Sequence, residues 1–126
     1  MYSERTLEHF RNPRNVGSLE APAVTVEVTN PACGDMMRLC ARFEEGRVAE
    51  ARYQTRGCTA SIATGSALTE WMIGKSRPEL AGLTPAMVDS LVDGLQLASK
   101  HAAILCVDAV RKLMAHSGRR GKSADD

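Results

Sequence analysis

MRLCARFEEGRVAEARYQT, residues 37–55, has the alternating pattern of a β-hairpin. Between residues 37 and 43 apolar and polar side chains alternate, so that one face of a strand would carry Met37, Leu39, Ala41 and Phe43. The tetrad Glu-Glu-Gly-Arg at 44–47 predicts the turn, and the alternation resumes over residues 48–55. The segment therefore predicts two antiparallel strands that share one apolar face.

A third strand is expected just upstream, over residues 23–29, where three valines alternate with polar side chains. Asn30-Pro31 is a turn signal that would end this strand. Residues 2–11 have the apolar spacing of a short helix, which stops ahead of Pro13. Together these elements predict a three-stranded antiparallel sheet with one solvated face and helices on the other face.

Downstream of Cys58 the apolar period becomes helical. Residues 59–73 predict a buried helix with Gly74 as its left-handed C-terminal cap, and 99–116 predict the last long helix. Short helices or turns are expected between them, one of them capped by Thr84 and started by Pro85. The fold class is therefore α+β: a small three-stranded antiparallel sheet packed by a C-terminal helical layer, with a short N-terminal helix.

The composition fits one domain spanning residues 1–126, with a polar, flexible tail expected over 117–126. The net charge of +1 gives no reason to expect a nucleic-acid partner. No apolar run has the length of a membrane span or the form of a secretory signal, so we expect a cytoplasmic protein. In that compartment the 4 cysteines favour thiols or metal ligands over disulfides.

Two cysteine motifs stand where strands are expected to end. They are Pro31-Ala32-Cys33-Gly34-Asp35 and Gly57-Cys58, and His101 lies far downstream at the start of the last long helix. Two thiols, a carboxylate and an imidazole make a reasonable four-donor set for a metal such as Zn²⁺. The glycines beside the two cysteines would let a backbone approach a metal or cluster closely, and the start of a helix favours thiolate at Cys58.

Structural roles are the alternative for each of these residues. The two cysteines could be buried loop residues that only pack, Asp35 could hydrogen-bond loop amides, and His101 could be a partly exposed helix residue. Cys106 has apolar neighbours that favour a place in the core, although it lies one helical turn from Ala102. Cys40 falls on the polar strand face and is interpreted as incidental to any site.

Six motifs follow one another along the chain. They are Tyr2-Ser3-Glu4 with His9-Phe10, 12–17 (NPRNVG), 31–35 (PACGD), 55–58 (TRGC), Thr69-Glu70-Trp71 with Gly74-Lys75-Ser76, and His101 with Ile104-Leu105 and Asp108-Ala109. Together they resemble the IscU/NifU N-terminal family of iron–sulfur cluster assembly scaffolds. The resemblance implies a SufE/NifU-like fold and a scaffold rather than an enzyme, with a [2Fe-2S] cluster or iron as its cofactor and Zn²⁺ possible in the isolated protein. Carried over by position, the implied ligands are Cys33, Asp35, Cys58 and His101.

The chain departs from the resembled family at two places. The family's third cysteine, which is associated with receiving sulfur from a cysteine desulfurase, is Ala102 here. Residues 95–100 read LQLASK where IscU members carry an LPPVK motif, which argues against docking of an Hsp70-type chaperone. The family implies a cysteine desulfurase and apo-protein cluster acceptors as partners.

Two functions stay open from the sequence. The first is a scaffold or carrier that binds a cluster or iron transiently, and the second is a divergent Zn²⁺-binding or regulatory relative that does not assemble clusters. A sulfur acceptor that uses Cys33 or Cys58 ranks behind both, because it would require a presumed ligand to act as the nucleophile.

Overall fold

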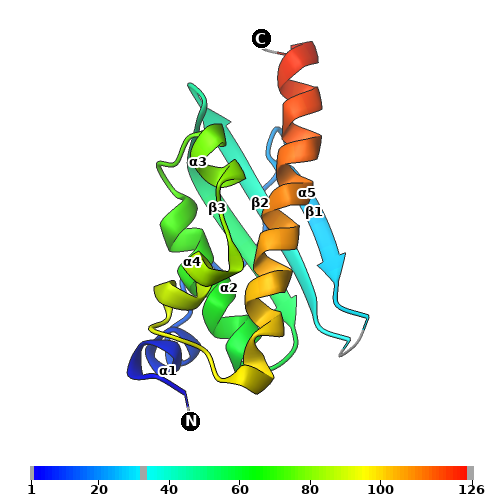
Figure 1. Cartoon of the computed structure of the whole chain (residues 1–126). Coiled ribbons are helices and arrows are strands. Elements are labelled where there is room, and N and C mark those ends of the chain that lie inside the picture. The colour runs from blue at the N-terminus through cyan, green and yellow to red at the C-terminus, as the bar shows by residue number, and fades with distance from the viewer. Residues whose placement is uncertain (1, 32–33, 125–126) are drawn as a thin grey trace.

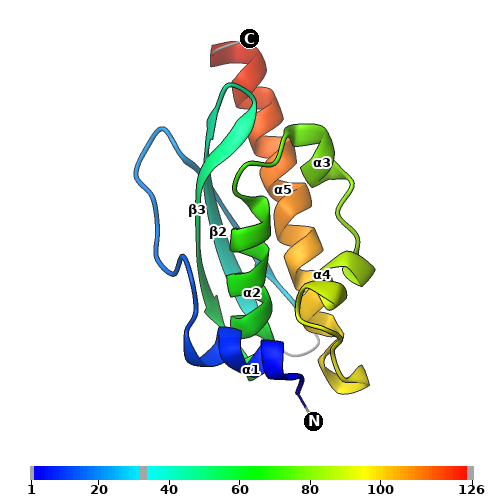
Figure 2. The same cartoon turned by 90° about the vertical axis from the view of Figure 1, so that its left-hand side faces the viewer.

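The computed structural model of the chain describes residues 2–31 and 34–124, with side chains described up to His116. A three-stranded sheet forms one layer and the long helices form the other (Figure 1, Figure 2). The α+β prediction is confirmed. In chain order the elements are α1 (Glu4–Arg11), β1 (Val24–Thr29), β2 (Met36–Glu44), β3 (Arg47–Arg56), α2 (Thr59–Met72), α3 (Arg77–Ala81), α4 (Pro85–Leu91), the 3-10 turn η1 (Leu97–Ser99) and α5 (His101–Ala124).

The sheet has the order β1-β2-β3, and both strand pairs are antiparallel. Glu45 and Gly46 are the two central residues of the predicted turn. Their φ angles are 53° and 79°, and a two-residue hairpin turn of this kind requires positive φ at both positions. In the centre of the sheet Leu39 pairs with Val26 on one side and with Tyr53 on the other. All three are buried, so the register places the apolar alternation of each strand on the same face.

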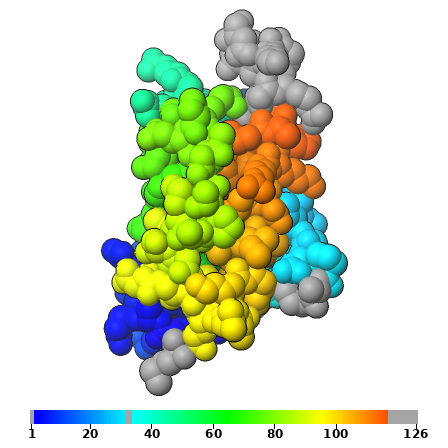
Figure 3. All heavy atoms as spheres, viewed as in Figure 1, coloured from blue at the N-terminus to red at the C-terminus, as the bar shows by residue number. Residues whose placement is uncertain are grey.

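Helices α2 and α5 cover that apolar face, and the space-filling view shows α3, α4 and η1 extending the same layer (Figure 3). Helix α2 lies close to β3 because residue 65 is glycine: a Cβ there would come within 2.4 Å of the Tyr53 ring. The Tyr53 hydroxyl donates to the Ile62 carbonyl over 2.7 Å, which satisfies the phenol inside the core. The core between the layers includes Met37, Leu39, Ala41, Val48, Leu68, Met72, Leu105, Val110 and Leu113.

The face of the sheet away from the helices is less solvated than the sequence predicts. Cys40 lies on that face but is fully buried, and the Thr25 hydroxyl donates to its sulfur over 3.2 Å. Its neighbour on β3 is Arg52, whose guanidinium donates to Asn15 Oδ1 over 3.1 Å. The segment around Asn15 pairs with the outer edge of β3 at Tyr53, so it covers part of this edge.

The helix ends follow the sequence signals at most places. Helix α2 ends just before Gly74, which has φ of +90°, and Thr84 caps α4 through a hydrogen bond from the Met87 backbone N–H. Helix α5 continues to Ala124, so its expected end at His116 is wrong. No proline interrupts residues 117–124, and single glycines cost a helix only about 1 kcal/mol each. Flexibility of residues 117–126 stays a prediction.

None of the helices in the described part of the chain is both long enough and apolar enough to span a bilayer.

Candidate metal and cluster site

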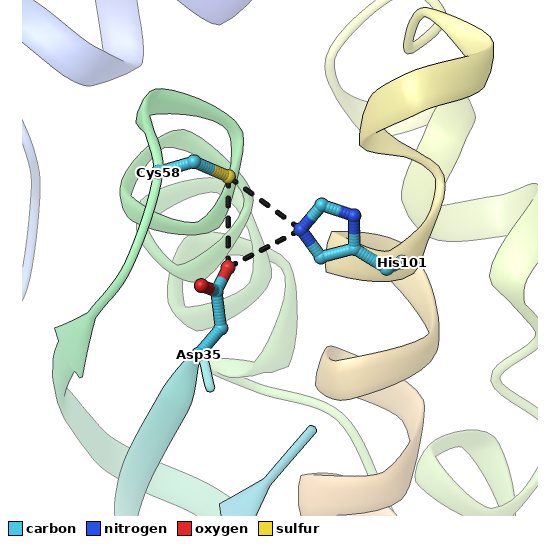
Figure 4. A group of neighbouring side chains, drawn as sticks. All are labelled: Asp35, Cys58 and His101. Carbon is cyan, nitrogen blue, oxygen red and sulfur yellow. Dashed lines mark hydrogen bonds and ion pairs between the residues drawn. The ribbon is translucent and has the colours of Figure 1, made fainter. Parts of the chain in front are cut away.

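Three of the four predicted ligands lie together where β2, α2 and α5 begin, with their side chains directed toward one another (Figure 4). Asp35 precedes β2, Cys58 precedes α2 and His101 is the first residue of α5. His101 Nε2 lies 3.2 Å from Asp35 Oδ2 and 3.7 Å from Cys58 Sγ, and the sulfur lies 3.6 Å from the same carboxylate oxygen. Each side chain therefore contributes one possible ligand atom, and the three atoms are close enough together to bind one metal ion.

The fourth predicted ligand, Cys33, lies outside the described residues. It stands two positions before Asp35 in the loop that joins β1 to β2. Backbone hydrogen bonds hold the described ends of this loop, from Asn30 N–H to the Asp35 carbonyl over 2.8 Å and from Gly34 N–H to the Asn30 carbonyl over 2.7 Å. Ligation by Cys33 stays a prediction.

Asp35 is held in place by its surroundings, with only 8% of its surface exposed. Burial alone would raise the pKa of its carboxyl, but hydrogen bonds from Ser61, His101 and Cys58 outweigh burial and lower that pKa below its ordinary value. The backbone N–H of Cys58 is among the donors. The carboxylate thus lies at the positive N-terminal end of α2, where a negative charge is favoured.

Gly57 gives the Asp35 carboxylate its room. A Cβ at residue 57 would lie 2.6 Å from Asp35 Cγ and 2.7 Å from Oδ2, closer than real Cβ contacts allow. The sequence interpretation, that this glycine lets the backbone approach a metal, therefore needs correction, because the group it admits is the carboxylate. Gly34 differs: its Cβ would meet nothing within 4 Å, and its φ of +79° is the reason for glycine.

His101 is positioned by the segment in front of α5. Asp89 on α4 accepts the Leu95 backbone N–H over 2.8 Å and the Lys100 ammonium over 3.0 Å, and the two bonds hold both ends of residues 95–100. The turn η1 lies within this segment and directly precedes α5, whose first residue, His101, is partly buried. His101 is a partly exposed helix residue, as the alternative interpretation described, but its imidazole also contacts Asp35 and Cys58.

Ser61 belongs to the site, although the sequence reasoning did not single it out. Its hydroxyl donates to Asp35 Oδ2 over 2.7 Å and lies 3.5 Å from Cys58 Sγ, and the side chain is fully buried. The available signal was its position three residues after Cys58, since side chains at i and i+3 share one face of a helix.

Ala102 and Cys106, the other two positions that the sequence analysis discussed on this helix, are both buried. Ala102 is fully buried, and its neighbour in sequence, His101, supplies the donor atom of this turn. Cys106 is fully buried one turn later; burial raises the pKa of its thiol to about 12, although a hydrogen bond with Thr64 lowers it. Cys106 is therefore a core residue, as predicted.

The donor set fits a metal of borderline softness. A thiolate, an imidazole and a carboxylate suit Zn²⁺, and thiolate with imidazole also occurs in iron–sulfur ligation. Cys58 and His101 are partly exposed while Asp35 is buried, so the site is open on one side. That arrangement suits a group that must be loaded and released.

Comparison with known proteins agrees with the fold. Residues 1–123 match the family described as "NifU-like N terminal domain". A similar protein is the "Iron-sulfur cluster assembly scaffold protein IscU 1" of Archaeoglobus fulgidus, which is 36% identical over 99% of this chain and 82% of its own length. The Drosophila melanogaster "Iron-sulfur cluster assembly enzyme IscU" is 39% identical over 91% of this chain and 77% of its own length.

A solved structure shows the same fold. The N-terminal part of a nitrogen-fixing NifU-like protein from Brucella abortus superposes with a TM-score of 0.61 and 24% identity, over 89% of this chain and 78% of that one. The predicted resemblance is therefore confirmed by both the family match and the curated relatives. This chain belongs to the family of NifU-like N-terminal domains, to which it is matched over nearly its whole length.

Proposed function

We propose that this chain is an iron–sulfur cluster assembly scaffold or carrier, which binds a [2Fe-2S] cluster or its iron transiently as cargo. The observation that supports it is the convergence of Asp35 Oδ2, Cys58 Sγ and His101 Nε2, all within 4.8 Å of one another. Cys33 is proposed as the fourth ligand from its place in the adjoining loop. The names of the relatives, which are assembly proteins, support the same function.

Transient binding follows from the chemistry of the donors. Mixed sulfur, nitrogen and oxygen ligation holds a cluster less tightly than four thiolates, and an open site lets an acceptor reach it. We therefore propose that the chain holds cargo without turning over a substrate. A cysteine desulfurase would supply sulfur and apo-proteins would receive the cluster, although residue 102 offers no thiol for sulfur delivery.

Anaerobic reconstitution with iron and sulfide tests this function. The wild-type protein should develop a visible charge-transfer spectrum, and Cys58→Ser and Cys33→Ser should lose it. Cys40→Ser is the matched control, because Cys40 is buried on the far face of the sheet and should leave the spectrum unchanged. A colourless wild type, under conditions that load IscU of Archaeoglobus fulgidus, would contradict the proposal.

A second function is favoured by Ala102. With one thiol fewer than the resembled family, the donor set moves toward a tetrahedral Zn²⁺ site of the S₂NO type. The chain would then be a Zn²⁺-binding or regulatory relative that does not assemble clusters. Elemental analysis of the purified protein separates the two: stoichiometric zinc that iron does not displace supports this function, and an intact cluster without zinc rules it out.

A further inference from the structure

The Ser61 hydroxyl makes the shortest side-chain contact of the site. Its Oγ lies 2.7 Å from Asp35 Oδ2 and 3.5 Å from Cys58 Sγ. A hydroxyl has one proton, and the shorter contact to a carboxylate oxygen has the geometry of a charge-assisted hydrogen bond. The proton of Ser61 is therefore assigned to Asp35, and Cys58 is left without a donor from Ser61.

Among the described residues, three side chains contact Asp35 Oδ2: Ser61, His101 and Cys58. A metal-bound cysteine is a thiolate and a metal-bound imidazole nitrogen carries no proton, so neither group can donate a hydrogen bond to Oδ2 once cargo is bound. The serine hydroxyl keeps its proton in either state. Of these three side-chain contacts, the Ser61 bond is thus the one that can persist from the free protein to the loaded one.

Ser61 is a buried residue at the start of a helix. It stands in the first turn of α2, three residues after the helix cap Cys58, and its side chain is fully buried. A buried hydroxyl needs a partner, and the partner here comes from a different element, the start of β2. The bond therefore joins the Asp35 and Cys58 ligand segments to each other directly.

We propose that Ser61 is a positioning residue, which orients the Asp35 carboxylate for metal or cluster ligation by a hydrogen bond that is kept when cargo binds. The inference rests on the proposed function, since it assumes that Asp35 is a ligand. Groups that hydrogen-bond a ligating side chain fix its orientation, and their loss costs about 10- to 100-fold in metal affinity.

Titration with Co²⁺ tests the inference, because Co²⁺ reports its ligand geometry through its visible absorption. Ser61→Ala should bind Co²⁺ about 10- to 100-fold more weakly than the wild type and show altered ligand-field bands. Thr64→Val is the matched control: Thr64 is a buried hydroxyl one turn later that bonds to the Ala60 and Ser61 carbonyls and should leave affinity and bands unchanged. Ser61→Thr keeps the donor and should restore wild-type affinity.

The outcomes are distinguishable. Wild-type affinity and bands in Ser61→Ala would overturn the positioning role, as would an equally weak Ser61→Thr variant, which would show that packing and not the donor matters. If Ser61→Ala does not fold by circular dichroism, Ser61→Thr decides alone, and a loss above about tenfold in it overturns the inference. Absence of Co²⁺ binding in the wild type would instead count against the proposed function itself.

Discussion

At the scale of single residues, the absence of a side chain at Gly57 matters to the site as much as the predicted ligands do. The Asp35 carboxylate occupies the volume where a side chain of residue 57 would begin. It is there because the start of α2 offers it N–H and O–H donors, from Cys58 and Ser61. One absent Cβ therefore leaves room for a carboxylate oxygen that belongs to another segment of the chain.

Gly57→Ala should displace Asp35 and weaken metal binding. The new Cβ would meet the carboxylate at 2.6 Å, and overpacking of this kind costs about 1–3 kcal/mol of the free energy of unfolding. Urea unfolding measures the stability and Co²⁺ titration measures the affinity. Gly82→Ala is the control, because its Cβ would find only ordinary contacts at 3.6 Å and beyond. Equal affinity in Gly57→Ala and Gly82→Ala would contradict this account of Asp35.

At the scale of elements, a buried polar contact joins α1 to α2. His9 Nδ1 lies 2.7 Å from Ser66 Oγ and 3.1 Å from the Arg14 guanidinium. Because a guanidinium only donates, Nδ1 is the acceptor and the neutral ring carries its proton on Nε2. Burial first, and the charge of Arg14 second, lower the pKa of His9 below its ordinary 6.5. The contact between α1 and α2 therefore favours the neutral form of the His9 imidazole.

Stability should fall as the pH falls below about 6.5. In that range the unfolded chain binds a proton at His9 and the folded chain does not. The free energy of unfolding therefore rises with pH up to about pH 6.5, and above that pH the contribution of His9 is fully present. Urea unfolding between about pH 8 and about pH 5.5 measures the slope. His9→Gln removes the titrating group and should reduce this slope, and an unchanged slope in that variant would assign the pH dependence to other residues.

At the scale of the whole molecule, the sequence predicts what depends on local pattern and misses what depends on distant neighbours. The hairpin follows from the alternation of apolar and polar residues and from the turn at Glu45-Gly46. The convergence of Asp35, Cys58 and His101 follows from strand and helix termini that lie at the same end of the sheet. Ser61 was missed because a small polar residue in an apolar helix gives no periodic signal. The edge contact near Asn15 was missed because it rests on one bridge to Tyr53.

Metal should stabilise the fold as a whole. A ligand that binds only the folded chain raises the free energy of unfolding by about 2.7 kcal/mol when its free concentration is 100 times its Kd. Thermal and urea unfolding with and without Zn²⁺ should show this rise, and a chelator should reverse it. In Cys58→Ser the rise should be lost. A similar rise in that variant would mean that Zn²⁺ binds elsewhere.

The three described donors are far apart along the chain, with separations of 23, 43 and 66 positions between them. No short peptide cut from this protein can reproduce the site, since each donor is fixed by a different strand end or helix start. An ion bound by these three donors would accordingly close long loops and act as a removable cross-link between β2, α2 and α5. A substitution that loosens the packing of α5, such as one at the buried Leu113, should therefore lower the affinity for metal without touching a predicted ligand.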